Sequence, residues 1–277
     1  MAINQTYGEY LRKALLFLDN QYTYQDLQFL IMRYKKWNLT EFLAKQQQIV
    51  TADDQQWLDM AIAKLQKNYP LQYLFGYELF FDREFIVNEH TLIPRPETEW
   101  IVDYILQNEH LANQKIADIG TGSGVIGLTL KLEEHSAAVT ITDIDEQTLA
   151  VAKQNASHLQ ADVQFMLGDN LQALDTKYDI IVSNPPYIAE TEKDVMDVSV
   201  IQYEPHQALF ADHHGLSFYE QFVALLPHYL HDDGRVYLEI GYKQGTAVAE
   251  MLQKQFPNKE IQVLKDYNNN ERLVVMK

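Results

Sequence analysis

A glycine-rich segment between an apolar run and a helical pattern constrains the fold of this chain more than any other feature. Residues 115–128 read Lys-Ile-Ala-Asp-Ile-Gly-Thr-Gly-Ser-Gly-Val-Ile-Gly-Leu. They predict a strand ending near Asp118, a tight turn whose glycines let a ligand approach the backbone, and a helix beginning near Gly124. Counted from Gly120, Val125 stands where the dinucleotide pattern has its third glycine, and no Gly-Lys-Ser/Thr of a phosphate-binding loop follows. Taken alone, the segment also fits a plain strand-to-helix turn.

From Pro94 onward, strand and helix patterns alternate along the chain. Such alternation predicts an α/β domain with a mostly parallel sheet and helices on both faces. The last two strands flank Asn268-Asn-Asn270, which is too short for a crossover, so these two strands are predicted to pair antiparallel. Strands are predicted at 115–119, 138–143, 163–167, 178–183, 235–240, 261–267 and 272–277, and helices at 97–110, 124–134, 146–159, 217–230 and 243–256.

The first 70 residues differ from the rest because they carry helical periodicity and few β-like runs. Thr23, Thr40 and Thr51 are predicted to begin helices, because a threonine side chain can accept a hydrogen bond from a backbone amide of the first turn. A small helical bundle is therefore predicted for this part of the chain.

A connector rich in aromatic and β-branched residues follows at 77–93. Its pattern around Asp82 predicts a β-hairpin. Its aromatic side chains, Phe80 and Phe85 among them, are expected to form a core between two domains, and a recognition surface is the alternative. The predicted parts are a helical domain at 1–70, a connector with the hairpin at 71–93, and the α/β domain at 94–277.

Polar side chains follow several predicted strands at their carboxyl ends. Asp143 ends the second strand of the α/β domain, about 20 residues beyond the glycines, where a nucleoside-binding fold holds a ribose diol. Asp169 and Asn170 follow the third strand, and Asn184 follows the fourth. Because open α/β sheets bind ligands at the carboxyl ends of their strands, these side chains predict a ligand site there.

The fourth strand is followed by Asn-Pro-Pro-Tyr at residues 184–187. Each proline fixes its own φ and removes a backbone donor, and the residue before a proline is pushed to an extended conformation. Carbonyl oxygens there can face outward and accept hydrogen bonds, while Tyr187 offers an aromatic face. The segment therefore predicts a rigid clamp for a planar nitrogen, although alone it fits a rigid strand end equally well.

The charge of the chain bears on its substrate. The net charge is −17, with 22 Lys and Arg against 39 Asp and Glu. Nucleic-acid binders usually carry a basic footprint, so this charge argues against a DNA duplex. It weakly favours a basic protein loop, and acidity that only supports solubility explains it as well.

Residue types and runs exclude other classes of protein. The chain has no cysteine, which excludes disulfides, thiolate zinc sites and cysteine nucleophiles. The 9 histidines are scattered without a His-Glu-x-x-His pair, so no metal site is predicted. The N-terminus does not resemble a signal peptide, and no apolar run approaches the roughly 18 residues that cross a bilayer. We therefore expect a cytoplasmic protein that makes no contact with a membrane.

Together, the glycine loop, Asp143 and Asn-Pro-Pro-Tyr resemble those of class I S-adenosylmethionine-dependent methyltransferases that act on planar amide or amino nitrogens. Four further segments are similar to the PrmC/HemK family, and the likeness runs from about residue 70 to the C-terminus. These segments are Pro70-Leu-Gln-Tyr-Leu-Phe-Gly76, Leu92-Ile-Pro-Arg-Pro-Glu-Thr-Glu99, Tyr203-Glu-Pro-His-Gln-Ala-Leu-Phe210 and Leu238-Glu-Ile-Gly-Tyr-Lys-Gln-Gly245.

The resemblance implies a Rossmann-like fold, a reaction and a partner. It implies a seven-stranded, mostly parallel methyltransferase sheet and S-adenosylmethionine as cofactor. The implied reaction is methylation of the glutamine side-chain amide in the Gly-Gly-Gln motif of peptide chain release factors. We also expect a monomer that makes no direct contact with nucleic acid. One alternative is a nucleic-acid methyltransferase acting on an exocyclic base amine, which predicts base flipping and a basic channel. Another is a non-catalytic module that binds release factors, against which the intact motifs argue.

The resemblance also implies the roles of the clamp residues. The side-chain oxygen of Asn184 and the carbonyl of Pro185 are expected to accept the two N–H groups of the target amide. Pro186 stiffens the loop, and Tyr187 packs against the amide plane. Arg95 and Thr98 are expected either to close the pocket or to belong to a helix start with Pro96.

Cofactor binding is expected to involve the glycine loop and the acids at the strand ends. Asp118 is expected to support the glycine turn and the methionyl ammonium group, Asp143 to hold the ribose, and Asp169 and Asn170 to lie beside the adenine. The implied cofactor-binding residues are Asp118, Gly120, Thr121, Gly122, Ser123, Gly124, Asp143, Asp169, Asn170 and Asn184.

Overall fold

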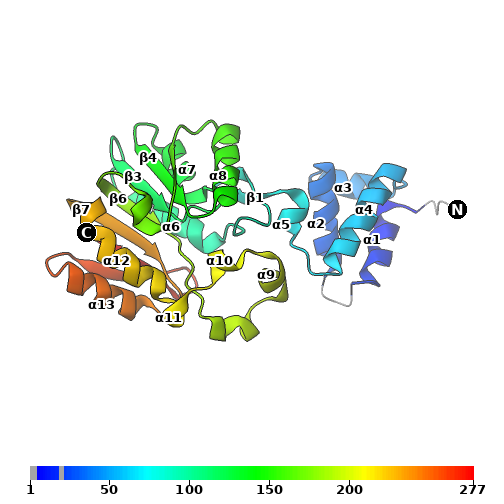
Figure 1. The fold of residues 1–277 in the computed structure, drawn as a ribbon. Coiled ribbons are helices and arrows are strands. Elements are labelled where there is room, and N and C mark those ends of the chain that lie inside the picture. The colour runs from blue at the N-terminus through cyan, green and yellow to red at the C-terminus, as the bar shows by residue number, and fades with distance from the viewer. Residues whose placement is uncertain (1–4, 19–21) are drawn as a thin grey trace. The chain divides into compact units, whose positions relative to one another are not determined.

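The computed structural model describes residues 5–18 and 22–277 and divides the chain into two compact units, Met1–Phe75 and Gly76–Lys277 (Figure 1). This division falls inside the predicted connector, so that a short helix belongs to the first unit and the hairpin to the second. Residues 1–4 and 19–21 of the predicted helical domain lie outside the described residues. The three-part division of function along the chain stays a prediction.

The first unit is helical, and most of its helices begin at residues whose side chains cap them. Thr23 and Thr51 cap helices as predicted, each accepting a hydrogen bond from the backbone amide three residues on. The prediction at Thr40 is wrong, because Asn38 caps that helix and its Oδ1 accepts from the Glu41 amide at 2.9 Å. The helices are α1 (Tyr7–Leu15), α2 (Tyr24–Lys35), α3 (Leu39–Lys45), α4 (Ala52–Leu65) and α5 (Leu71–Phe75).

The second unit opens with the predicted hairpin of β1 (Tyr77–Phe80) and β2 (Arg83–Ile86). Its two-residue turn, Phe81 and Asp82, has φ of 52° and 58°, the left-handed conformation that matches the twist of a tight hairpin. Phe80 and Phe85 are buried and pack with the helices and strands of the second unit. These two rings therefore belong to the core of one unit and do not form a separate core between domains.

The predicted seven-stranded sheet is confirmed, in the order β5-β4-β3-β6-β7-β9-β8. Neighbouring strands from β5 to β7 run parallel, and β9 runs antiparallel to both β7 and β8. The strands are β3 (Lys115–Ile119), β4 (Ala138–Asp143), β5 (Gln164–Leu167), β6 (Tyr178–Ser183), β7 (Leu230–Glu239), β8 (Ile261–Lys265) and β9 (Glu271–Met276).

Both faces of the sheet are covered, because successive side chains of a strand point to opposite sides. In β6, Ile180 and Val182 pack into one core with α6, α7, α8 and the hairpin, while Ile181 packs into the other with α12 and α13 (Figure 1). The covering helices are α6 (Pro96–Asn108), α7 (Val125–Glu133), α8 (Glu146–Leu159), α12 (Ser217–Tyr229) and α13 (Gly245–Gln255).

The order of the strands places the predicted site. The chain leaves β3 toward β4 and β5 on one side, and β6 then pairs with the other side of β3. Such a switch point is where open α/β sheets bind ligands, beyond the carboxyl ends of the strands. The glycine loop follows β3 and Asn184 follows β6, so the two motifs meet at this edge.

Several short helices were not predicted. One lies between β5 and β6, the others lie between β6 and α12, and each is too short to show a helical period. They are η1 (Asn170–Ala173), η2 (Glu190–Val195), α9 (Val198–Tyr203), α10 (His206–Leu209) and α11 (Asp212–Gly215). Across residues 5–18 and 22–277, no helix is both long and apolar enough to cross a membrane.

Candidate active site

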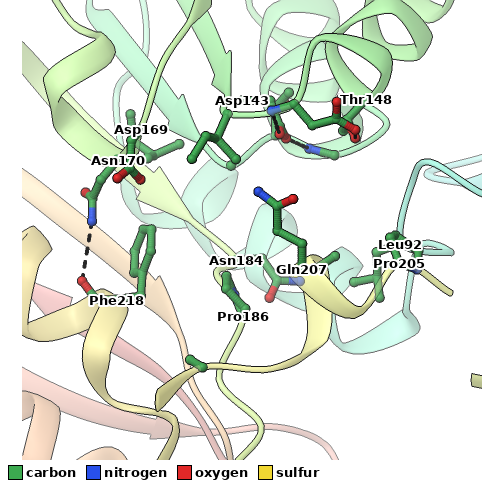
Figure 2. A pocket seen from close by; sticks show the side chains of 18 of the residues that line it. Leu92, Asp143, Thr148, Asp169, Asn170, Asn184, Pro186, Pro205, Gln207 and Phe218 are labelled. Carbon is green, nitrogen blue, oxygen red and sulfur yellow. Dashed lines mark hydrogen bonds between the residues drawn. The ribbon is translucent and has the colours of Figure 1, made fainter. Parts of the chain in front are cut away.

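A cavity of about 360 Å³ lies at the carboxyl ends of β3, β4, β5 and β6 (Figure 2). It brings together most of the residues that the sequence predicted for the site. Asp118, Gly124, Pro185 and Tyr187 are not part of its lining. The predicted residues that do line it are Gly120, Thr121, Gly122, Ser123, Asp143, Asp169, Asn170, Asn184 and Pro186.

The glycines of the loop serve two different purposes. Gly120 and Gly122 have φ of 67° and 59°, and a Cβ added to either would meet nothing within 4 Å. The space beside them is therefore open for a ligand to approach the backbone. Gly124, at φ 90°, begins α7, and a Cβ there would come within 2.7 Å of Leu128 Cδ1. Gly124 is thus required for packing inside the protein.

Asp118 lies behind the glycine loop and is fully buried. Its Oδ2 accepts hydrogen bonds from Thr121 Oγ1 at 2.6 Å and from the Gly127 amide at 2.9 Å. Burial raises the pKa of this carboxyl to about 6, although the two hydrogen bonds oppose the shift. These contacts fit the predicted support of the glycine turn. A contact between Asp118 and an ammonium group stays a prediction, since Asp118 is not part of the cavity wall.

Asp143 is held with its carboxylate at the cavity wall. Its Oδ2 accepts from the Gly122 amide at 3.0 Å, and its Oδ1 accepts from the Asp145 amide at 3.0 Å. Burial raises the pKa of Asp143, while these backbone donors oppose the rise. A carboxylate has about four lone-pair positions, so each oxygen can still accept a hydrogen bond from a ligand hydroxyl.

Asn170 and Phe218 form the far end of the cavity (Figure 2). Asn170 has φ of 51°, its Oδ1 accepts from the Leu171 amide at 2.8 Å, and its Nδ2 donates to the Phe218 carbonyl at 3.4 Å. Both ends of this amide therefore form hydrogen bonds within the protein, and these bonds join η1 to the start of α12. Asp169 lines the cavity and is exposed.

Asn184 is oriented by residues from two other elements. Its Nδ2 donates to Thr98 Oγ1 in α6 at 3.1 Å, and Thr98 Oγ1 donates to Glu239 Oε2 at the end of β7 at 2.8 Å.

Arg95 is the N-cap residue of α6, with Pro96 in the first turn, and its Nη2 lies 2.5 Å from Glu204 Oε1. The helix-start interpretation of this segment is thus correct.

Pro185 and Tyr187 lie beside the cavity. Pro185 is buried, and Tyr187 packs partly buried against the core that includes α12. The Tyr187 carbonyl accepts from Gln244 Nε2 at 2.8 Å, which ties this loop to the turn before α13. Burial raises the pKa of the Tyr187 hydroxyl above its ordinary value. The packing of Tyr187 against the amide plane of a substrate stays a prediction.

The opposite wall was not predicted residue by residue. It comes from the short helices after η2, from the first turns of α12 and from the approach to α6, and Figure 2 shows Gln207 extending from α10 into the cavity. The only signal in the sequence was the likeness of segments 92–99 and 203–210 to a known family. The additional lining residues include His90, Leu92, Pro205, Gln207, Ala208, Phe210, Asp212, Phe218 and Gln221.

The residues present fit a nucleoside-containing cofactor such as S-adenosylmethionine. The volume of about 360 Å³ lies in the range of roughly 300–1,000 Å³ for small-molecule sites. The open sides of Gly120 and Gly122 leave room beside the backbone, and the fixed Asp143 carboxylate suits a diol. In the described part of the chain, no group of three or more His, Cys, Asp or Glu residues is arranged to hold a metal ion.

Comparisons with known proteins agree on a family. Two family models match: the PrmC N-terminal domain over residues 9–76 and the methyltransferase small domain over residues 98–212. The release factor glutamine methyltransferase of Enterococcus faecalis is 40% identical over 274 residues, covering 97% of this chain and 98% of that protein. Its namesake in Streptococcus pneumoniae is 38% identical over 253 residues, covering 91% of each. A methyltransferase structure from Pyrococcus furiosus shares the fold, with a TM-score of 0.54 at 17% identity over 82% of this chain and 98% of that one.

Proposed function

Because the chain belongs to the family of release factor glutamine methyltransferases, we propose that it methylates peptide chain release factors with S-adenosylmethionine. The acceptor is the side-chain amide nitrogen of the glutamine in the Gly-Gly-Gln motif. The observation that carries this proposal is that Asn184 lines the same cavity as the glycine loop and Asp143. An amide clamp and a cofactor cradle therefore face one another.

The chain holds the cofactor through its backbone and one carboxylate. Gly120 and Gly122 give backbone access, and Asp143 accepts hydrogen bonds from the ribose hydroxyls. Asp169 and Phe218 lie at the end of the cavity where the base would be. When bound, S-adenosylmethionine supplies a methyl group already activated on a sulfonium cation.

The clamp residues act on the nitrogen that receives the methyl group. An amide nitrogen is a poor nucleophile because its lone pair is delocalised into the carbonyl. Asn184 Oδ1 and the Pro185 carbonyl accept its two N–H groups, which orients the lone pair and stabilises positive charge as it develops. Pro186 stiffens the loop, and Tyr187 packs against the amide plane. Such positioning can lower the activation barrier by roughly 7–11 kcal/mol.

The distribution of charge supports a protein substrate. Residues 76–277 hold 32 of the 39 acidic residues but only 14 of the 22 basic ones. The unit with the cavity is therefore strongly acidic, which attracts a basic loop and repels a polyanion. This disfavours the alternative of a nucleic-acid base methyltransferase.

The remaining assignments belong to the same proposal. The helical unit, Met1–Phe75, docks the release factor and takes no part in methyl transfer. We also propose a cytoplasmic location, which a substrate in the translation machinery supports. We also propose that it acts as a monomer and touches no nucleic acid directly.

Mass spectrometry tests the proposal. A release factor incubated with the protein and S-adenosylmethionine should gain one methyl group, located by fragmentation on the motif glutamine. A release factor with alanine at that glutamine is the matched control and should gain none. Single-stranded DNA, duplex DNA and RNA should stay at background in a radiolabelled methyl assay. Labelling of a nucleic acid without labelling of the release factor would establish the alternative function.

A further inference from the structure

Three side chains from separate elements form a chain of hydrogen bonds that ends at the cavity. Glu239, at the end of β7, and Thr98, in the first turn of α6, are both almost fully buried. Glu239 Oε2 accepts from Thr98 Oγ1 at 2.8 Å, and Thr98 Oγ1 accepts from Asn184 Nδ2 at 3.1 Å. Of the three, Asn184 alone lines the cavity.

The direction of this chain follows from what each group can donate. An ionised carboxylate only accepts, so Thr98 must give its single hydroxyl proton to Glu239. The Thr98 oxygen is then left as an acceptor, and only the NH₂ end of Asn184 can satisfy it. The carbonyl end of Asn184 is thereby turned away from Thr98. This orientation is the one that the carbonyl needs in order to accept a hydrogen bond from a substrate in the cavity.

We propose that Thr98 and Glu239 are positioning residues for methyl transfer, which act by fixing which end of the Asn184 amide receives the substrate. The inference rests on the proposed function, because the acceptor end matters only if the substrate presents N–H groups. Neither residue lines the cavity, so both act through Asn184.

The same geometry makes the orientation depend on the charge of Glu239. A protonated Glu239 can donate, which frees the Thr98 hydroxyl to donate to the Asn184 carbonyl and lets the amide turn over. Burial raises the pKa of Glu239 to about 7, although the Thr98 hydrogen bond and the Arg272 guanidinium oppose the rise. The other charged or titratable groups that face it are Arg95 at the N-cap of α6, Glu97 in α6, Tyr187 from the loop after β6, and Tyr219 from α12.

Thr98→Val is the direct test, because valine keeps the shape of threonine and removes the hydroxyl. On whole release factor, kcat should fall about 10- to 100-fold, the scale of a misplaced reacting group. The affinity for S-adenosylmethionine, measured by calorimetry, should stay within about twofold, since the mutated side chain is not on the cavity wall. Thr98→Ser restores the hydroxyl and should recover most of kcat, which a merely structural loss of the methyl group would not do.

Glu239→Gln tests the charge. In the wild-type protein, kcat should rise with pH through about 7 as Glu239 ionises. The Glu239→Gln variant cannot ionise at this position, so its kcat should be flat between about pH 6 and 8. A pH profile of the same shape in wild type and Glu239→Gln would remove Glu239 from the proposal.

Two results separate this inference from the proposed function. If the wild-type protein methylates no release factor, the proposed function itself fails. If the wild type is active and Thr98→Val has the same kcat, the positioning role is wrong. A Thr98→Val loss that Thr98→Ser does not recover would also overturn it, because the hydroxyl would then not be the group that matters. Calorimetric cofactor binding shows in each case that the variant is folded.

Discussion

The carboxylate of Asp143 accepts a hydrogen bond from the backbone amide of Gly122 at 3.0 Å. This bond ties the end of β4 to the loop after β3, two strands that lie side by side in the sheet. It orders the glycine turn and, at the same time, fixes the oxygen atoms that face the cavity. One side chain therefore both shapes the cofactor site and contacts the cofactor in the proposed complex.

Asp143→Ala should weaken the binding of S-adenosylmethionine by about 1.5–3 kcal/mol, the value of a hydrogen bond to a charged group. Isothermal titration calorimetry measures this directly. Asp162→Ala is the matched control, since it removes an exposed acid that does not line the cavity. If the Asp143→Ala variant bound S-adenosylmethionine as tightly as the control, Asp143 would not be the residue that holds the ribose. Asp145 would then be the next candidate on the cavity wall.

Asn184→Ala should lower kcat about 10²–10³-fold, because it removes one of the two acceptors that orient the target amide. Cofactor affinity should change much less, so the loss should appear in single-turnover methylation at saturating cofactor. Calorimetry on the same preparation checks that the site is intact. Turnover close to wild type would show that another group accepts the amide hydrogen.

Gly127→Ala should destabilise the second unit by about 1–3 kcal/mol, although alanine normally favours a helix over glycine. An added Cβ would lie 2.4 Å from Ile141 Cγ2 and 3.1 Å from Asp118 Oδ2, where the core leaves no room. Gly8→Ala in α1 is the matched control, because its nearest contact would be an ordinary 3.4 Å. Chemical denaturation of both variants gives the comparison, and equal stability of Gly127→Ala and wild type would contradict the packing argument.

The regular part of the fold could be predicted because each element carries its own local signal. β3, β4 and β6 begin and end where the sequence predicts, since they are short apolar runs bounded by polar or turn residues. β7 begins at Leu230, five residues before its predicted start at Arg235, because Asp232 and Asp233 interrupt the apolar pattern. Its first residue still pairs with Tyr178, across a shift in register.

The site could be predicted only where a motif states it. Gly122, Asp143 and Asn184 follow strands, and that position predicts that they lie at the ligand site, while their roles come from the resemblance to a family. The contacts of Asn184 could not be predicted, since Thr98 lies 86 residues away from it and Glu239 lies 141 residues from Thr98. Only the folded sheet brings them together. The sequence shows no helical period of apolar residues for the wall built from α10 and α11, because these helices have four residues each.

Arg95→Ala should loosen the wall of the cavity. Glu204 is almost fully buried, and it accepts from both the Arg95 guanidinium at 2.5 Å and the Ile93 amide at 3.0 Å. Losing the cation should lower the free energy of unfolding by about 1–2 kcal/mol. This loss is smaller than for a fully buried ion pair because Arg95 is partly exposed. Hydrogen exchange should speed up at 198–210. Arg83→Ala, which breaks a 2.5 Å pair with Glu133 away from the cavity, is the control and should leave that segment unchanged.

Removal of the helical unit tests its docking role. A chain of Gly76–Lys277 keeps the hairpin, both cores beside the sheet and every residue assigned to the cofactor, so S-adenosylmethionine should bind nearly as well as to the whole protein. Methylation of whole release factor should show a KM raised at least about tenfold, because substrate capture is lost while the clamp is intact. A short Gly-Gly-Gln peptide, a slow substrate from the start, should be methylated at an unchanged rate. Circular dichroism and cofactor calorimetry check that the shortened chain is folded. An unchanged KM for whole release factor would show that the helical unit does not dock the substrate.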